Sequence, residues 1–93
     1  MKRDLLRTPG FVRTAKKLAK KHPLLSAELP VILNLLSEDA DNPRLKSHKL
    51  KGKLEGSWAC SLSYDMRIVF SIIQHEGKEA ILLETIGTHD EVY

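Results

Sequence analysis

The spacing of apolar residues changes partway along this chain of 93 residues, from a helical interval to strict alternation. In residues 11–19 and 29–36 the apolar positions recur every three or four residues, which places them on one face of a helix. In the segment SWACSLS, Trp58, Cys60 and Leu62 alternate with small residues, a pattern typical of a half-buried strand. Two further apolar runs, RIVFSII and AILLETI, follow and are separated by a turn that contains glycine. A chain with its helices before its strands predicts an α+β fold.

Proline and glycine set the limits of the first elements. A weak strand pattern over residues 2–8 ends at Pro9, which is followed by a glycine. The first amphipathic helix begins at Phe11 and is broken at His22, because the next residue is a proline.

The second helix is harder to delimit because Pro30 lies among its apolar residues. Proline is tolerated in the first turn of a helix, so we predict that this helix begins near Ala27 or Glu28 and ends around residues 37–38. The chain is then one domain over residues 1–93. Its predicted fold is α+β, with two N-terminal helices packed on a mostly antiparallel sheet of about four strands.

The distribution of charge favours a polyanionic or acidic partner. The net charge is +3, with 42% hydrophobic and 29% charged residues, which is ordinary for a soluble globular protein. Lysine and arginine gather in residues 13–21 and 44–53, whereas acidic residues gather in 28–41 and 84–91. Such asymmetry suggests a basic face, although a solvated helix or loop surface would give the same pattern.

Cysteine content and hydropathy indicate in which compartment the protein works. The single cysteine, Cys60, cannot form an internal disulfide, and its place in a strand pattern favours a buried structural thiol. The N-terminal residues lack the apolar run of a signal peptide, and no segment approaches the roughly 20 apolar residues of a membrane span. We expect a cytoplasmic protein that does not enter the membrane.

The basic segment at residues 46–53 carries the first candidate site. In an extended chain alternate residues share a face, so His48 is expected beside Lys46, with Lys49, Lys51 and Lys53 on the other side. Four lysines in eight residues are suited to contacting several RNA phosphates. A solvated edge strand that uses lysine against aggregation is the alternative interpretation.

Arg67 is the second candidate, because it stands at the start of a strand where an apolar residue would be expected. A guanidinium there is suited to binding a phosphate or a carboxylate. The alternative is a structural salt bridge with Asp65, Glu55 or Glu84.

The C-terminal segment GTHDEVY places His89 and Tyr93 four residues apart, directly after a strand. If this tail forms a helical turn, both side chains lie on one side of it. Histidine exchanges protons near neutral pH, and tyrosine donates a hydrogen bond or stacks on a base. The histidines have no recognisable metal spacing, so we expect neither a metal nor another cofactor.

The segments LKGKLEGSWACSLSYDMRIVF and GTHDEVY, with the order of elements, resemble the RelE/ParE superfamily of small bacterial toxins. The likeness is greatest to the YafQ and YoeB branches of the RelE-type mRNA interferases. The resemblance implies a RelE-like microbial ribonuclease-type fold and the toxin of a type II toxin–antitoxin module. It further implies a metal-independent endoribonuclease that cleaves mRNA at the ribosome and is silenced by a cognate antitoxin, expected to be acidic and DNA-binding. Attack by the ribose 2′-hydroxyl would leave a 2′,3′-cyclic phosphate and a free 5′-hydroxyl.

The resemblance also implies roles for individual residues. His48 matches the proposed general base, and Arg67 matches the arginine that holds the scissile phosphate. His89 matches the histidine of the YafQ-type ending and is the candidate general acid. Tyr93 matches the terminal aromatic residue that orients the substrate base, and Asp65 matches an aspartate that supports a histidine or the turn.

Three positions depart from the YafQ-like pattern. Ser61 replaces a second histidine, Met66 a tryptophan and Thr85 an arginine. We therefore expect Arg67, helped by Lys49 or Lys51, to take over the task of the missing arginine.

Two functions of other classes remain open from the residues alone. A ParE-like gyrase inhibitor would use the same fold without nuclease chemistry. A non-catalytic RNA- or ribosome-binding domain would use only the basic segment. Neither would need His48 or His89, so alanine at both positions separates these functions from that of an enzyme.

Overall fold

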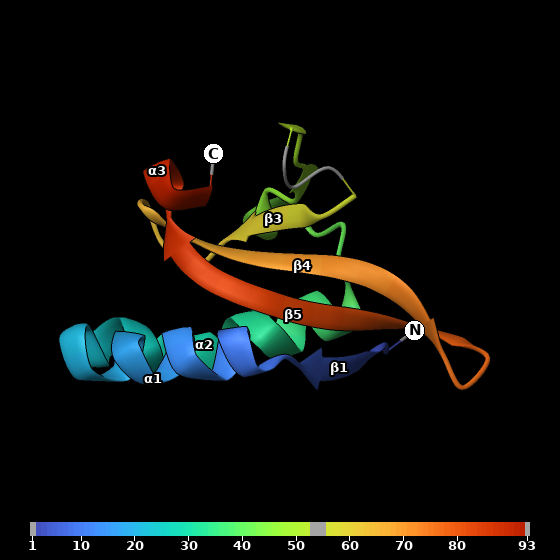
Figure 1. Cartoon of the computed structure of the whole chain (residues 1–93), viewed down its shortest axis with the longest axis horizontal. Coiled ribbons are helices and arrows are strands. Elements are labelled where there is room, and N and C mark those ends of the chain that lie inside the picture. The colour runs from blue at the N-terminus through green and yellow to red at the C-terminus, as the bar shows by residue number, and fades with distance from the viewer. Residues whose placement is uncertain (1, 53–55, 93) are drawn as a thin grey trace.

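The computed structural model describes residues 2–52 and 56–92 as a helical layer packed on a five-stranded sheet (Figure 1). The elements in chain order are β1 (Asp4–Arg7), α1 (Pro9–Lys21), α2 (Pro23–Glu38), the 3-10 helix η1 (Pro43–Leu45), β2 (His48–Lys49), β3 (Trp58–Ser61), β4 (Met66–His75), β5 (Lys78–Thr88) and α3 (His89–Val92). The strand order is β1-β5-β4-β3-β2, with β1 parallel to β5 and every other pair antiparallel. The predicted α+β class and mostly antiparallel sheet are confirmed. Over the described residues the sheet has one strand more than the expected four, because the short β2 adds an edge.

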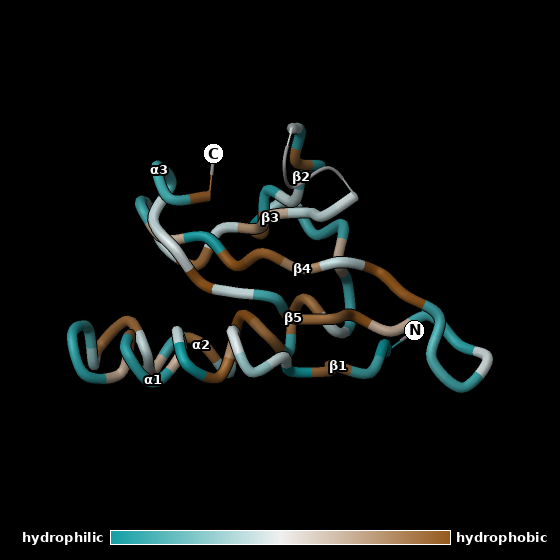
Figure 2. The backbone as a smooth tube through the Cα atoms, in the orientation of Figure 1, coloured by the Kyte–Doolittle hydropathy of each residue, from teal (hydrophilic) through white to brown (hydrophobic). Residues whose placement is uncertain are grey.

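The two long helices cover one face of the sheet, and α3 lies beyond the other face (Figure 1). The main core between the helices and the sheet is built from Phe11, Leu18, Leu29, Leu33, Leu36, Cys60, Ile68, Phe70, Ile81, Leu83 and Ile86, with others around them. The brown apolar segments of α1, α2 and the central strands meet in this layer (Figure 2). A smaller cluster of Leu50, Ala59, Val69 and Val92 lies on the opposite face. Side chains of successive strand residues point to opposite faces, so the second face is available for a site.

Hydrogen bonds from Thr8 fix the start of α1 against the sheet. Its Oγ1 accepts from Phe11 N (3.1 Å) as an N-cap and donates to the carbonyl oxygen of Leu83 (2.9 Å) in β5. At Gly10 a Cβ atom would lie 3.1 Å from the carbonyl oxygen of Glu84, so the helix approaches β5 closely there. The first turn of α1 is therefore tied directly to the strand that ends at the candidate site.

The second helix begins at Pro23, and the prediction of a start near Ala27 or Glu28 is wrong. Pro23 occupies the first helical position, where its missing N–H costs nothing, and Pro30 lies inside the helix. Proline in a helix interior removes one backbone hydrogen bond. Burial of Leu29, Leu33 and other apolar residues on either side of Pro30 offsets that loss. The predicted end at residues 37–38 is confirmed, since α2 ends at Glu38.

Candidate active site

Arg67 lies on the face of the sheet that the long helices leave uncovered. It pairs with Ser61 of β3 and Gly87 of β5, and its neighbour Ile68 points into the main core on the other face. Arg67 Nη1 lies within hydrogen-bond distance of the carbonyl oxygens of Ser63 (2.9 Å), Tyr64 (3.1 Å) and Met66 (3.1 Å). None of the carboxylates in residues 2–52 and 56–92 forms an ion pair with Arg67, so the alternative of a salt bridge to Asp65 or Glu84 is not realised. Glu55, the third partner considered, lies outside the described residues. Neutral carbonyls hold the guanidinium in position without neutralising its charge.

Arg67 opens onto a cavity of about 640 Å³ at the end of the sheet where β3 turns into β4. Arg44 of η1, Lys46, and both His89 and Asp90 of α3 line the same cavity. Arg44 was not among the candidate residues, although it belongs to the basic block at 44–53. Two arginines and one lysine therefore share one hollow with an imidazole and with the carboxylates of Asp65 and Asp90. Basic side chains are in excess, an arrangement suited to binding a phosphodiester.

The position of His89 is set by its backbone and by a reciprocal cap on α3. His89 N donates to the carbonyl oxygen of Asp65 (2.7 Å), which joins the start of α3 to the β3–β4 turn. Thr88 N donates to Glu91 Oε1 (2.8 Å), and Glu91 N donates to Thr88 Oγ1 (3.2 Å). This is a capping box in which each residue satisfies the other's backbone. At Gly87 a Cβ atom would meet Val92 Cγ2 at 3.3 Å, so a glycine allows α3 to fold back over β5.

This cap predicts an acid-sensitive α3. The hydrogen bonds from Thr88 lower the pKa of Glu91 below its usual 4.5, so the ionised carboxylate stabilises the folded state above that value. The stabilisation is lost as the pH falls through the lowered pKa, and Glu91→Ala should remove it at every pH. Backbone amide chemical shifts of residues 88–92 between pH 7 and pH 3 measure this effect. Identical pH dependence in wild type and Glu91→Ala would contradict it.

His48 shares its sheet face with Arg67 but does not line the Arg67 cavity. It pairs with Ala59, and Ala59 pairs with Val69, two residues along β4 from Arg67. His48 is therefore two strands away from Arg67 in the sheet and offset from it by two residues along the strand direction. At the usual strand spacing and rise per residue, their Cα atoms are about 12 Å apart. His48 Nδ1 lies 3.1 Å from the carbonyl oxygen of Lys46. A carbonyl only accepts, so this contact puts the proton on Nδ1 and the lone pair of the neutral ring on Nε2.

The lysines of the basic segment at residues 46–53 line two separate cavities. Lys46 lines the Arg67 cavity, whereas Lys49 and Lys51 line a separate hollow of about 710 Å³ together with Trp58. Lys49 pairs with Trp58, whose ring packs against the main core, and Lys49 Nζ lies 5.5 Å from the centre of that ring. Lys49 is therefore on the face opposite to Arg67, and Arg44 with Lys46 takes the place expected for Lys49 or Lys51. Lys53 and Tyr93 lie outside the described residues.

Asp65 and Tyr64 belong to the exposed turn between β3 and β4. Both line the Arg67 cavity, and Tyr64 is 98% exposed. The carbonyl oxygen of Asp65 holds His89 N, so Asp65 supports the turn through its backbone. Within the two described ranges no group of three His, Cys, Asp or Glu side chains is arranged to hold a metal ion.

Cys60 lies behind Arg67 in the main core, as the alternation of β3 predicted. Burial raises the pKa of its thiol from 9.0 to about 12, and the nearby Arg67 charge offsets only part of this effect.

A thiol held in its neutral form reacts slowly with electrophiles, because the thiolate is the nucleophile. We expect iodoacetamide at pH 8 to label Cys60 at least about 100-fold more slowly in the native protein than in urea. Mass spectrometry over time checks this rate, with free cysteine as the reference. Equal labelling rates in both conditions would contradict the buried, protonated thiol.

Comparisons with known proteins identify a matching family and similar solved structures. A family model described as "Bacterial toxin of type II toxin-antitoxin system, YafQ" matches residues 3–93. YafQ from E. coli strain BL21(DE3) is 18% identical with a TM-score of 0.78, and the match covers 98% of each chain. A copper-bound mutant toxin from Helicobacter pylori is 25% identical with a TM-score of 0.73 over 100% of each chain. The E. coli DinJ–YafQ complex contains a chain that is 19% identical with a TM-score of 0.77, covering 98% of each. The comparison with curated proteins gave no match.

Proposed function

The chain belongs to the YafQ family of toxins of bacterial type II toxin–antitoxin systems, and we propose that its toxic activity is metal-independent cleavage of mRNA. The observation that carries the proposal is the cavity of about 640 Å³ in which Arg67, Arg44 and Lys46 surround His89. Cations of this density attract a phosphate, and an imidazole beside them supplies a proton donor.

The reaction requires three operations on one RNA linkage. A base removes the proton of the 2′-hydroxyl, a cation offsets the charge on the pentacoordinate phosphorus, and an acid protonates the leaving 5′-oxygen. The bond from the 2′-oxygen to phosphorus forms as the bond to the 5′-oxygen breaks. The products are a 2′,3′-cyclic phosphate and a 5′-hydroxyl, with no net change in protons.

We assign the three operations to His48, Arg67 and His89. Nε2 of neutral His48 carries the lone pair needed by a base, on the same sheet face as Arg67. A separation of about 12 Å between their Cα atoms leaves room for one phosphodiester between the two side chains. His89, in the lining of the cavity, supplies the proton, and the bond from its backbone N–H to the carbonyl oxygen of Asp65 and the α3 cap fix its backbone. Tyr93, one residue beyond α3, is assigned to contact the substrate base.

The ribosome and an antitoxin are the proposed partners. A site with so few groups gains most from a substrate that is already oriented, and mRNA held on the ribosome supplies that orientation. A YafQ chain occurs in complex with DinJ in E. coli, and this supports a cognate antitoxin for the present chain. An acidic antitoxin is favoured by the pI of about 9.1. No helix over the described residues is long and apolar enough to cross a membrane.

Inducible expression followed by mapping of mRNA 5′ ends tests the proposal. New 5′-hydroxyl ends inside coding regions are expected, and added EDTA should leave cleavage by purified protein unchanged. Growth arrest without new RNA ends, or DNA breakage in their place, would contradict it and favour gyrase inhibition. The His48→Ala, His89→Ala double variant should bind RNA but produce no ends.

A further inference from the structure

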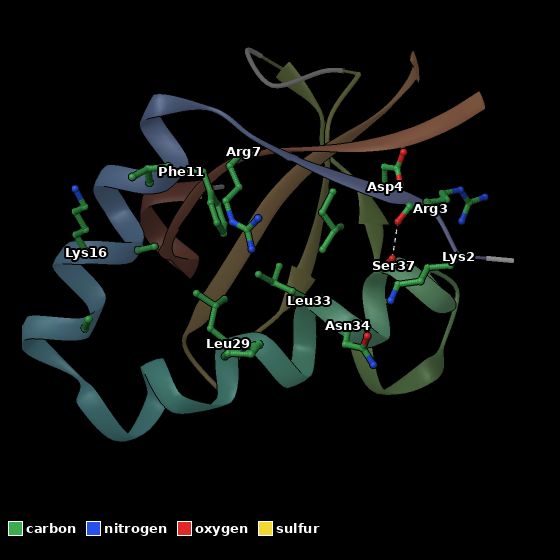
Figure 3. A pocket seen from close by; sticks show the side chains of 15 residues that line it. Lys2, Arg3, Asp4, Arg7, Phe11, Lys16, Leu29, Leu33, Asn34 and Ser37 are labelled. Atoms are coloured by element: carbon green, nitrogen blue, oxygen red, sulfur yellow. Dashed lines mark hydrogen bonds between the residues drawn. The ribbon is translucent and has the colours of Figure 1, made fainter. Parts of the chain in front are cut away.

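The aromatic residues of the described chain differ widely in how much of their rings is exposed. Phe11 and Phe70 are each 1% exposed and belong to the main core. Phe11 also lines the groove between β1, α1 and α2, but as a core residue it offers that groove almost no ring surface (Figure 3). Trp58 is partly buried against the same core, and Lys49 Nζ lies 5.5 Å from the centre of its ring. Tyr64 is 98% exposed, so within the described part of the chain it offers the most open aromatic surface.

The backbone on either side of Tyr64 is held by hydrogen bonds, although its ring is exposed. Ser63 N donates to the carbonyl oxygen of Met66 (3.3 Å), and Met66 N donates to Ser63 Oγ (3.2 Å). On the other side of Tyr64, the carbonyl oxygen of Asp65 accepts from His89 N (2.7 Å). The turn between β3 and β4 therefore presents the ring from a fixed place, which lowers the entropy that a ligand loses on binding to it.

Tyr64 is joined directly to the arginine of the proposed site. Arg67 Nη1 donates to the carbonyl oxygen of Tyr64 (3.1 Å), and both residues line the cavity of about 640 Å³. Arg44 and Lys46 line the same cavity. An open ring beside cations is the combination that binds single-stranded nucleic acid, since the cations bind phosphates and the ring stacks on a base. A phosphate bound at Arg67 brings an adjoining base within reach of Tyr64.

We propose that Tyr64 binds a base of the mRNA by stacking, at a nucleotide next to the linkage that is cleaved. This subsite rests on the proposed function, cleavage of mRNA at Arg67, and adds a substrate contact to it. Stacking uses the flat face of a base and not its hydrogen-bonding edge, so the subsite accepts any base. Tyr64 is a substrate-binding residue in this scheme and takes no part in proton transfer.

An mRNA base is favoured over ribosomal RNA and over an antitoxin side chain as the ligand of this ring. The ring belongs to the lining of the same cavity as Arg67, which binds the mRNA linkage in the proposed mechanism. A protein partner is favoured by a contiguous exposed apolar patch. Ile32 and Leu62 are the other apolar residues of this lining over the described residues, and the rest of the lining is polar or charged.

Removing the ring should weaken substrate binding and leave the chemical step nearly unchanged. With ribosome-bound mRNA we expect Tyr64→Leu to raise KM about tenfold and to change kcat by less than about threefold, because stacking acts alike on bound substrate and transition state. Tyr64→Phe keeps the ring and should keep KM within about threefold of wild type. Leu24→Ala is the matched control, because it removes an 89% exposed apolar side chain of α2 outside the cavity, and it should change neither constant.

The fluorescence of 2-aminopurine identifies the base that lies on the ring. In separate ribosome-bound messages the label replaces the base on the 5′ side or on the 3′ side of the mapped cleavage position, and a 2′-deoxy nucleotide blocks cleavage. At one of these positions, wild type and Tyr64→Phe should quench the label at least about twofold more than Tyr64→Leu does. Equal quenching by all three proteins at both positions overturns the subsite. If Tyr64→Leu then also binds the ribosome more weakly, the ring contacts ribosomal RNA.

The outcomes distinguish this subsite from RNA cleavage itself. Quenching that depends on Tyr64, with an all-ribose message that stays intact, overturns the cleavage and leaves the binding of a base standing. Cleavage by Tyr64→Leu with the wild-type KM overturns the subsite and leaves the cleavage standing. A wild-type protein that neither binds nor cleaves the message overturns both. A Tyr64→Leu variant that loses affinity for the antitoxin alone places the ring in that interface and contradicts the subsite.

Discussion

Replacing Arg67 with alanine is expected to slow single-turnover RNA cleavage by at least about 100-fold and to abolish growth inhibition. The guanidinium is one of the three basic groups that line the cavity, and backbone carbonyls orient it. In the proposed mechanism its charge therefore acts on the phosphorus without reorganisation during the reaction. Arg67→Lys keeps a charge but loses the planar fork, so we expect an intermediate rate.

The control for Arg67 must separate catalysis from folding, because Arg67 Nη1 also binds the β3–β4 turn. Thermal unfolding of Arg67→Ala should remain cooperative, with a midpoint within several degrees of wild type. Arg13→Ala, on the exposed side of α1, removes one positive charge elsewhere and should keep nearly full activity. A folded Arg67→Ala protein that cleaves at the wild-type rate would remove Arg67 from the mechanism.

Replacing His89 with alanine is expected to slow cleavage by about 10²- to 10⁴-fold and to change its pH dependence. A base and an acid that act in one step give a bell-shaped dependence of the rate on pH, with one limb for each group. His89→Ala should lose the falling limb, and His48→Ala should lose the rising one. Single-turnover rates from pH 5 to pH 9 measure both limbs.

His75→Ala is the matched control for the imidazoles. His75 lies at the far end of β4, remote in sequence and register from Arg67, and its loss should leave the profile bell-shaped. A flat wild-type profile would count against both histidines. A His89→Ala variant that retains both limbs would assign the acid to another group.

Much of the fold was predictable because periodicity records which face of each element is buried. The alternation at Trp58, Cys60 and Leu62 predicted β3, and helical spacing predicted the buried leucines of α2. The start of α2 was missed because the pattern does not reveal that neighbouring contacts tolerate Pro30 inside a helix. The parallel pairing of β1 with β5 depends on contacts between the two ends of the chain, which local spacing does not contain.

The residue types of the candidate site were predictable from the sequence. Which of these residues lie around the same cavity was harder to predict. Arg67 and His89 do line one cavity. Lys49 falls on the opposite face because the register of β2 against β3 pairs it with Trp58. Arg44 was overlooked because a 3-10 helix, which has no strong sequence signature, turns it toward Arg67. Strand register and loop geometry were thus the missing information.

The most direct measurement uses a ribosome-bound mRNA with a single 2′-deoxy substitution at the nucleotide 5′ to the mapped cleavage position. Without that hydroxyl no nucleophile remains, so cleavage there should cease, while the all-ribose message yields a 2′,3′-cyclic phosphate detectable by mass spectrometry. Equal cleavage of the deoxy-substituted message, or a 5′-phosphate product, would mean that water attacks the linkage and would contradict a site built from an arginine between two imidazoles.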